Sequence, residues 1–168
     1  MTQLFILLFI VGGTYGALTL LNTFVKGVKL VKALRGRISL SLFFIFAGVS
    51  HFIVTQEMTQ MLPAFIPLRT EIIYLTGISE ILGGIGLLSS RWARLSSILL
   101  ILFLIGVLPA NIYAAMASIE FGGHAFGASY LLIRVPFQLF LIAWAYYFGI
   151  KLSPQQTRVK GFKPSYTP

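Results

Sequence analysis

Residues 72–88 have the sequence IIYLTGISEILGGIGLL, an apolar run whose only charged residue is Glu80. A membrane-spanning helix needs roughly 20 predominantly apolar residues, and a slightly shorter run is tolerated when its polar flanks reach the interface. The run therefore predicts a transmembrane helix. A charge near the centre of such a helix costs roughly 3 kcal/mol. Because of this cost, we expect Glu80 to face a partner or a cavity rather than lipid.

Four further apolar runs are long enough, or nearly so, to cross a bilayer. The composition agrees, because mean hydropathy is +0.90 and only 10% of the 168 residues are charged, against about a quarter in soluble domains. These features predict an all-α fold, a polytopic transmembrane helical bundle at residues 1–152, with a basic tail at 153–168. The four further runs lie at residues 4–24, 38–54, 95–117 and 130–150.

Basic residues are distributed unevenly over the connections between these runs. Eleven of the 13 Lys and Arg residues fall on one side of the predicted bundle, whereas the other side holds Arg69, and Arg134 lies within the last run. The positive-inside bias then places the N-terminus outside and the C-terminus in the cytoplasm. We expect a multi-pass protein of a bacterial cell membrane. The eleven residues are Lys26, Lys29, Lys32, Arg35, Arg37, Arg91, Arg94, Lys151, Arg158, Lys160 and Lys163.

The net charge of +9 has two possible meanings, nucleic-acid binding or contact with lipid head groups. The basic residues flank the apolar runs, as expected for head-group contact, so the lipid bilayer is the predicted partner and nucleic acid is not. The run at 4–24 carries its charge after the apolar core rather than before it, unlike a signal peptide. We interpret it as a membrane anchor.

The chain contains no Cys and two His residues. The absence of Cys excludes disulfides, thiolate metal ligands and thiol redox chemistry within this chain. Neither a Walker-type pattern nor an HExxH pattern is present. The sequence therefore predicts no metal site, and no cofactor is evident from its motifs.

Five polar residues lie inside these otherwise apolar stretches. With the orientation above and a rise of about 1.5 Å per residue, all five belong to the outer half of the bilayer, and nothing comparable is expected in the inner half. Their helical faces are consistent with one cluster. We interpret them as a candidate ligand-binding site in an outward-facing pocket, with no catalytic residue assigned. They are His51, Glu80, Asn111, Arg134 and Gln138.

A purely structural role competes with ligand binding for each of these residues. Glu80 and Arg134 can form an ion pair that fixes helix register. Asn111 and Gln138 suit hydrogen bonds between helices. His51 is suited to titration, but near the end of its run it can also face head groups or water. The sequence leaves a structural pair and a functional site open.

Two connections are candidates for covering such a pocket. Residues 55–70, TQEMTQMLPAFIPLRT, are too apolar for a simple solvated loop, and we expect them in the interface or over the mouth of the bundle. Residues 118–129 are Gly-rich. Pro109 and Pro136 each remove a backbone donor close to the polar set, which strengthens the same location.

Several ordered motifs resemble those of the DoxX-like integral membrane proteins, over about residues 38–150. The resemblance implies a DoxX-like four-helix core, to which the first run adds one N-terminal transmembrane helix. Members of that family are linked with thiosulfate:quinone oxidoreductase and methylamine-utilisation maturation, and distant relatives resemble receptor-assembly chaperones. The motifs are FAGVSHF at 46–52, PAFIP at 63–67, GISEILGGIGLL at 77–88, PANIYAA at 109–115 and RVPFQLFLIAWAYY at 134–147.

Three functions are compatible with these features. The first is an accessory or redox/quinone-linked membrane component, because Arg, His and Gln around an apolar pocket can hydrogen-bond a quinone carbonyl; whether it is an enzyme stays open. The alternative is a non-enzymatic assembly factor or chaperone-like subunit that binds another membrane protein or a second copy. A small-molecule transporter ranks last, because a transporter needs access to both sides.

Overall fold

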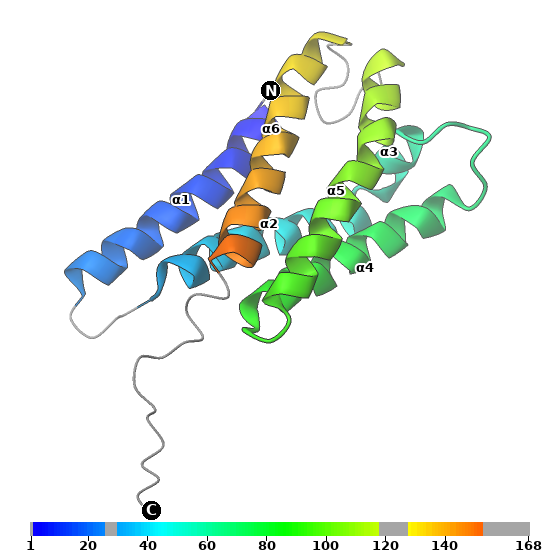
Figure 1. The fold of residues 1–168 in the computed structure, drawn as a ribbon. Coiled ribbons are helices and arrows are strands. Elements are labelled where there is room, and N and C mark those ends of the chain that lie inside the picture. Colours follow the sequence, from blue (N-terminus) through cyan, green and yellow to red (C-terminus); the bar gives the residue numbers. More distant parts are fainter. Residues whose placement is uncertain (1, 26–29, 118–127, 153–168) are drawn as a thin grey trace, which may run out of the picture.

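The computed structural model describes residues 2–25, 30–117 and 128–152, and all the regular structure within these ranges is helical. Five helical segments are long and apolar enough to cross a membrane, which confirms the predicted all-α bundle with five candidate spans (Figure 1). The elements are α1 (Thr2–Phe24), α2 (Lys32–Ile53), α3 (Thr55–Gln60), α4 (Arg69–Leu88), α5 (Ala93–Met116), α6 (Ala128–Ala145) and the π-helical turn η2 (Tyr146–Lys151).

The helices extend beyond the apolar runs that predicted them. α2 begins at Lys32 rather than at 38, and α4 begins at Arg69 rather than at 72. In lipid every backbone polar group must be satisfied within the chain, so a helix continues through its charged first turn. The segment 55–70 contains the short helix α3. The predicted tail at 153–168 and most of the Gly-rich segment at 118–129 lie outside the described residues.

α2 and α4 form an antiparallel pair at very close range through glycine. A Cβ atom added to Gly48 would lie 2.7 Å from the Gly77 carbonyl oxygen, and one added to Gly77 would lie 2.9 Å from the Gly48 carbonyl oxygen. Further along, a Cβ on Gly84 would lie 3.1 Å from the Ser41 carbonyl oxygen. Small residues permit this approach in a membrane helix pair. The small-residue face of α4 is therefore already used inside the bundle.

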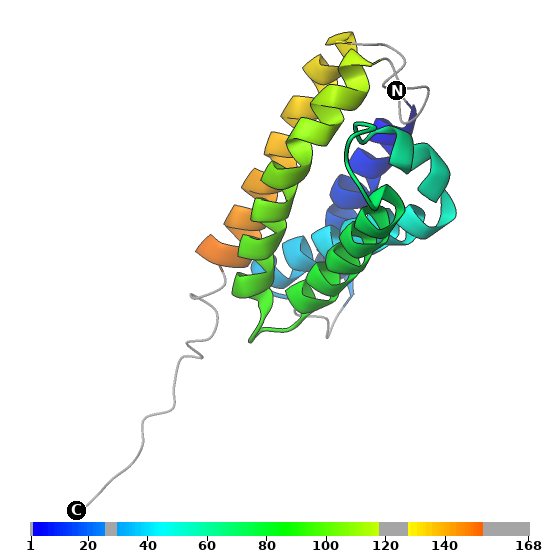
Figure 2. The same cartoon turned by 90° about the vertical axis from the view of Figure 1, so that its right-hand side faces the viewer.

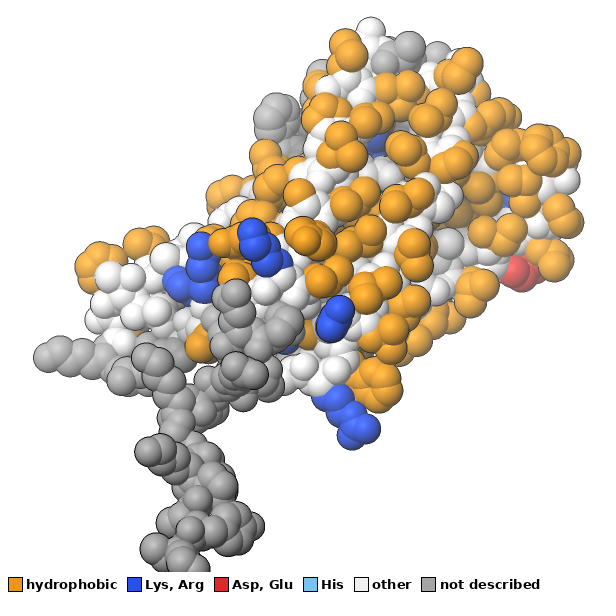
Figure 3. Space-filling model, viewed as in Figure 1, with side chains coloured by type: hydrophobic (Ala, Val, Ile, Leu, Met, Phe, Trp, Pro, Cys, Tyr) orange, Lys and Arg blue, Asp and Glu red, His pale blue; other side chains and the backbone are white. Residues whose placement is uncertain are grey.

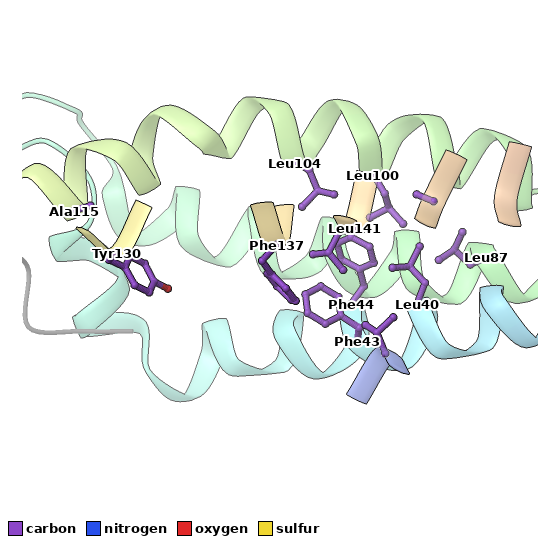
Figure 4. Packing of buried hydrophobic residues seen from close by; sticks show 12 residues of the cluster. Leu40, Phe43, Phe44, Leu87, Leu100, Leu104, Ala115, Tyr130, Phe137 and Leu141 are labelled. Atoms are coloured by element: carbon purple, nitrogen blue, oxygen red, sulfur yellow. The ribbon is translucent and has the colours of Figure 1, made fainter. Parts of the chain in front are cut away.

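The apolar core lies among α2, α4, α5 and α6, and α1 packs mainly against α2 at the periphery. α5 and α6 form a second antiparallel pair, which meets α2 and α4 at one end and diverges from them toward the end that carries α3 (Figure 2). The side chains that fill the narrow part are shown in Figure 4. They include Leu40, Phe43 and Phe44 of α2, Leu87 of α4, Leu100 and Leu104 of α5, and Phe137 and Leu141 of α6.

Lys and Arg side chains gather at one end of the bundle (Figure 3). This end carries the α1–α2 and α4–α5 connections and the end of η2 (Figure 1), and we call it the basic end. The arrangement agrees with the uneven charge distribution that the sequence predicts. The described basic residues there are Lys32, Arg35, Arg37, Arg91, Arg94 and Lys151.

The expectation that buried polar groups are confined to the other half was wrong. Arg37 is only 6% exposed, and Ser41 and Ser97 are fully buried near the basic end. In the described residues, Arg37 Nε and both serine Oγ atoms have no hydrogen-bond partner. The helices approach closely here: a Cβ on Gly149 of η2 would clash with Ser97 Oγ. Arg37 directly precedes the apolar run at 38–54, so the sequence suggests an exposed charge at the end of a span. In the structure α2 begins at Lys32, and Arg37 already lies inside the bundle.

Candidate functional site

A cavity of about 670 Å³ lies between the two helix pairs, toward the end opposite the basic end. Its lining is mostly apolar and comes from α1, α2, α4, α5, α6 and the α3 segment. Four of the five polar residues singled out from the sequence line it, and Gln138 does not. The four are His51, Glu80, Asn111 and Arg134.

The closest charged contact in the cavity joins His51 of α2 to Glu80 of α4. His51 Nε2 lies 3.3 Å from Glu80 Oε2, and the side chains are 15% and 10% exposed. The glycine contact between α2 and α4 explains this proximity: a Cβ on Gly77 would lie 2.8 Å from His51 Cβ. The His51 side chain therefore lies against α4 at Gly77, and Gly77 is about one helical turn before Glu80.

The ion pair between Glu80 and Arg134, which the sequence left as one alternative, does not form in the described part of the chain. Glu80 lies instead within 4 Å of His51, whose imidazole is a cation only when it is protonated. The Arg134 charge still interacts electrostatically with Glu80 over a longer distance. The reason is the packing of the helices, because α4 contacts α2 extensively but is not among the principal neighbours of α6.

The hydrogen bonds at His51 Nδ1 determine where its proton lies. Nδ1 is 3.1 Å from the Ile73 carbonyl oxygen and 3.1 Å from Thr76 Oγ1, and the Thr76 hydroxyl itself donates to the Ile73 carbonyl at 2.8 Å. A carbonyl can only accept, so we assign the donor role to Nδ1–H. Nε2 is then the ring nitrogen that faces Glu80, at 3.3 Å from Oε2.

The His51–Glu80 contact is a close approach of two ionisable groups and not a hydrogen bond of normal geometry. Glu80 Oε2 is buried and makes no hydrogen bond in the described residues. Both residues line the cavity, so their contact forms part of its wall.

Arg134 extends into the cavity from α6 and is partly exposed there. Within residues 2–25, 30–117 and 128–152 it has no hydrogen bond and no ion pair shorter than 4 Å. Tyr130 lies one turn earlier on α6. Tyr130 also lines the cavity and is 3% exposed.

Gln138 ties α6 to α5 instead of facing the cavity. Its Nε2 donates to the Leu104 carbonyl, so the interhelical hydrogen bond expected for this residue is confirmed. Leu104 precedes Ile105, whose carbonyl lacks a helical donor because of Pro109. Gln138 therefore joins the two helices next to the position where Pro109 removes one hydrogen bond from α5.

Asn111 lines the cavity but hydrogen-bonds within its own helix, because its Nδ2 donates to the Val107 carbonyl at 3.1 Å. An amide nitrogen carries two N–H groups, so one further donor is available on the cavity side of α5. The interhelical bond expected for Asn111 is absent from the described residues.

Sequence reasoning missed Thr76 and Tyr130 as members of the site. Each lies four residues before a polar residue that had been selected, Glu80 and Arg134 respectively, and therefore on the same helical face. That spacing is the signal that could have identified them. The α3 segment contributes Met58, Met61 and Leu62 to the lining, so part of the 55–70 segment covers the cavity.

The fold and the cavity together define a class: a membrane-type helical bundle with a mainly apolar cavity between its helix pairs that contains a few convergent polar groups. Residues 40–149 match the family described as Domain of unknown function (DUF8561), and the chain belongs to that family. A comparison with curated proteins found no match, and neither did a comparison with solved structures. The matched range includes the five selected polar residues and begins after α1.

Proposed function

We propose that this protein is an integral membrane component that binds a lipid-soluble ligand in the cavity and serves a redox- or quinone-linked process. The observation that carries the proposal is the convergence of Arg134, His51 and Glu80 on one cavity of about 670 Å³. Ligand sites in proteins typically measure about 300–1,000 Å³, with apolar walls and a few placed polar groups. The resemblance to DoxX-like proteins supports the same class of function.

A quinone suits the chemistry of this lining. Its carbonyl oxygens can accept hydrogen bonds from the Arg134 guanidinium and from the second N–H of Asn111. Its ring and tail can pack against aromatic walls that include Phe43 and Phe103. The chain contains no Cys, and we expect any electrons for such a ligand to come from a partner protein. The role that follows is that of an accessory component.

The proposed orientation places the basic end in the cytoplasm, because Lys and Arg are enriched in cytoplasmic connections. The cavity then lies toward the outer face. This orientation fits a ligand that enters from the outer leaflet. The buried groups at the basic end, such as Arg37, do not line the cavity, so the transporter interpretation gains no continuous polar path from them.

Equilibrium binding of a decyl-substituted benzoquinone to the full chain in nanodiscs tests this proposal. Empty nanodiscs give the correction for partition into lipid. Arg134→Ala should weaken binding at least tenfold, whereas Arg94→Ala, at an exposed position of the basic end, should leave it unchanged. Equal affinity of the wild type and Arg134→Ala would remove the quinone assignment.

A second candidate function is that of an assembly factor that binds another membrane protein. It is favoured by Gly12 and Gly16 on peripheral α1, where an added Cβ would meet no atom within 4 Å. Glycines at this spacing permit close helix–helix contact in membranes. Cross-linking in native membranes should then capture one dominant partner, and Gly12→Leu should reduce its yield. Recovery of the monomer alone would contradict this function.

A further inference from the structure

The described lining of the cavity contains four ionisable groups, His51, Glu80, Tyr130 and Arg134. The Arg134 guanidinium is always ionised. The Glu80 carboxylate lies 3.3 Å from His51 and is not within 4 Å of Arg134. The cavity therefore contains a permanent positive charge that has no carboxylate beside it in the described residues.

Nothing in the described lining neutralises Arg134 at close range. Among the described residues that line the cavity, Glu80 is the only carboxylate, and its Oε2 is 3.3 Å from His51 Nε2. A charge without a close partner is costly inside a membrane bundle, even where it is only partly buried. An anion placed beside Arg134 would remove that cost, whereas a neutral ligand would leave it in place.

The hydrogen-bonding groups near Arg134 favour the same kind of ligand. Gln138 of α6 contacts Leu104 of α5, which fixes the register of this antiparallel pair. Arg134 lies one turn from that contact on α6, and Asn111 lies about two turns from it on α5, toward the same end of the bundle. Both side chains have N–H groups to donate, so they match a head group that only accepts.

Most of the remaining lining is apolar and includes Ile6, Leu7, Phe46 and Leu141. It suits the hydrocarbon part of a ligand and offers few polar groups for a sugar or a peptide. α3 and the residues after it add Met58, Met61 and Leu62 on one side. The cavity thus combines one positively charged, donor-rich region with an apolar body.

We propose that the ligand of this cavity is an amphiphile with a single oxyanion head group, bound with the oxyanion at Arg134. The inference rests on the proposed function, because it names the class of ligand for the same site. A long-chain carboxylate and an ionised hydroxyquinone both present this chemistry. Either source places one oxygen-centred negative charge on an apolar body.

Two matched pairs of ligands test the charge requirement. The first pair is dodecanoate and dodecanol, and the second is a 3-alkyl-2-hydroxy-1,4-naphthoquinone and its methyl ether. Binding to the full chain is measured at pH 7.5 in nanodiscs of zwitterionic lipid, with empty nanodiscs as the reference for partition. We expect the anionic member of at least one pair to bind the wild type at least tenfold more tightly than its neutral partner. The pair that shows the difference identifies the source.

Variants at position 134 separate charge from shape. Arg134→Gln should abolish the preference for the anion, and Arg134→Lys should retain part of it. If the neutral members bind the wild type as tightly as the anions, the charge inference is wrong although the proposed ligand site stands. If no member of either pair binds the wild type, and the decyl-substituted benzoquinone does not bind either, the proposed function fails as well. The comparison of anionic and neutral ligands on the wild type tests the charge requirement even if a variant does not fold.

Discussion

His51 Nε2 lies 3.3 Å from Glu80 Oε2, across the interface of α2 and α4. Glycines at this level allow the two helices to approach each other closely. This contact replaces the pairing of Glu80 with Arg134 that charge alone suggests. Its consequence is that the Arg134 charge has no carboxylate within 4 Å among the described residues and is available to a ligand.

Separate and combined substitutions of the pair measure its structural contribution. His51→Leu leaves a buried Glu80 without its partner and should lower the free energy of unfolding by about 3 kcal/mol. Adding Glu80→Leu should restore most of this loss, because no buried ionisable group is then left unpaired. Glu71→Gln, at an exposed position of α4, is the control. Denaturation in mixed micelles measures each value, and additive losses in the double variant would show that the two side chains are not coupled.

The glycine contact is expected to position the pair. Gly77→Ala introduces a Cβ 2.8 Å from His51 Cβ, and an overpacked site of this kind typically costs about 1–3 kcal/mol. It should also move His51 away from Glu80. Gly12→Ala adds the same atom in open space and should not destabilise the protein. If the two variants have the same stability, the close approach of α2 and α4 is not required.

Gln138 and Asn111 are expected to affect different properties. Gln138→Leu removes the hydrogen bond to the Leu104 carbonyl and should lower stability by about 1 kcal/mol, as measured for polar contacts between membrane helices. Ligand affinity should change little, because Gln138 does not line the cavity.

Asn111→Leu should have the opposite profile, because its hydrogen bond stays within α5 and its side chain lines the cavity. We expect at least a threefold loss of ligand affinity with a small effect on stability. Binding and denaturation of both variants are measured under the same conditions. A larger loss of affinity in Gln138→Leu than in Asn111→Leu would contradict this division of roles.

The orientation of the chain can be determined with single cysteines, because the sequence contains none. Arg91→Cys, at the basic end, should react with a membrane-impermeant maleimide only after the membrane is opened. Phe65→Cys, at a position that is 85% exposed on the opposite side, should react in intact cells. The reverse pattern would invert the proposed topology and place the cavity toward the cytoplasm.

Much of the polar site could be selected from the sequence because charges and amides are rare inside apolar runs. Those residues are costly in lipid and must therefore be satisfied inside the bundle. His51, Glu80, Asn111 and Arg134 were found in this way, and they line one cavity. Their partners could not be selected in the same way, because a charge pattern does not specify which helix lies beside which.

Arg37, at the basic end of the bundle, also shows that a charge pattern does not specify how the helices pack. Its position in the sequence is that of a flanking charge, yet it is buried. At this end of the bundle η2 packs against both α2 and α5, and it approaches α5 closely at Gly149 and Ser97. Small residues are weak signals in a hydropathy pattern but strong determinants of helix packing.

The sequence by itself determined the helical spans and the separation of the basic connections to one side, because lipid forces apolar backbone into helices and charge bias sets topology. The tertiary structure alone decided that Glu80 lies beside His51, that Gln138 binds the α5 backbone, and that Arg134 faces the cavity with no carboxylate within 4 Å among the described residues. The physical reason is that those contacts are set by short-range packing between helices, chiefly at Gly48 and Gly77, which residue composition does not encode.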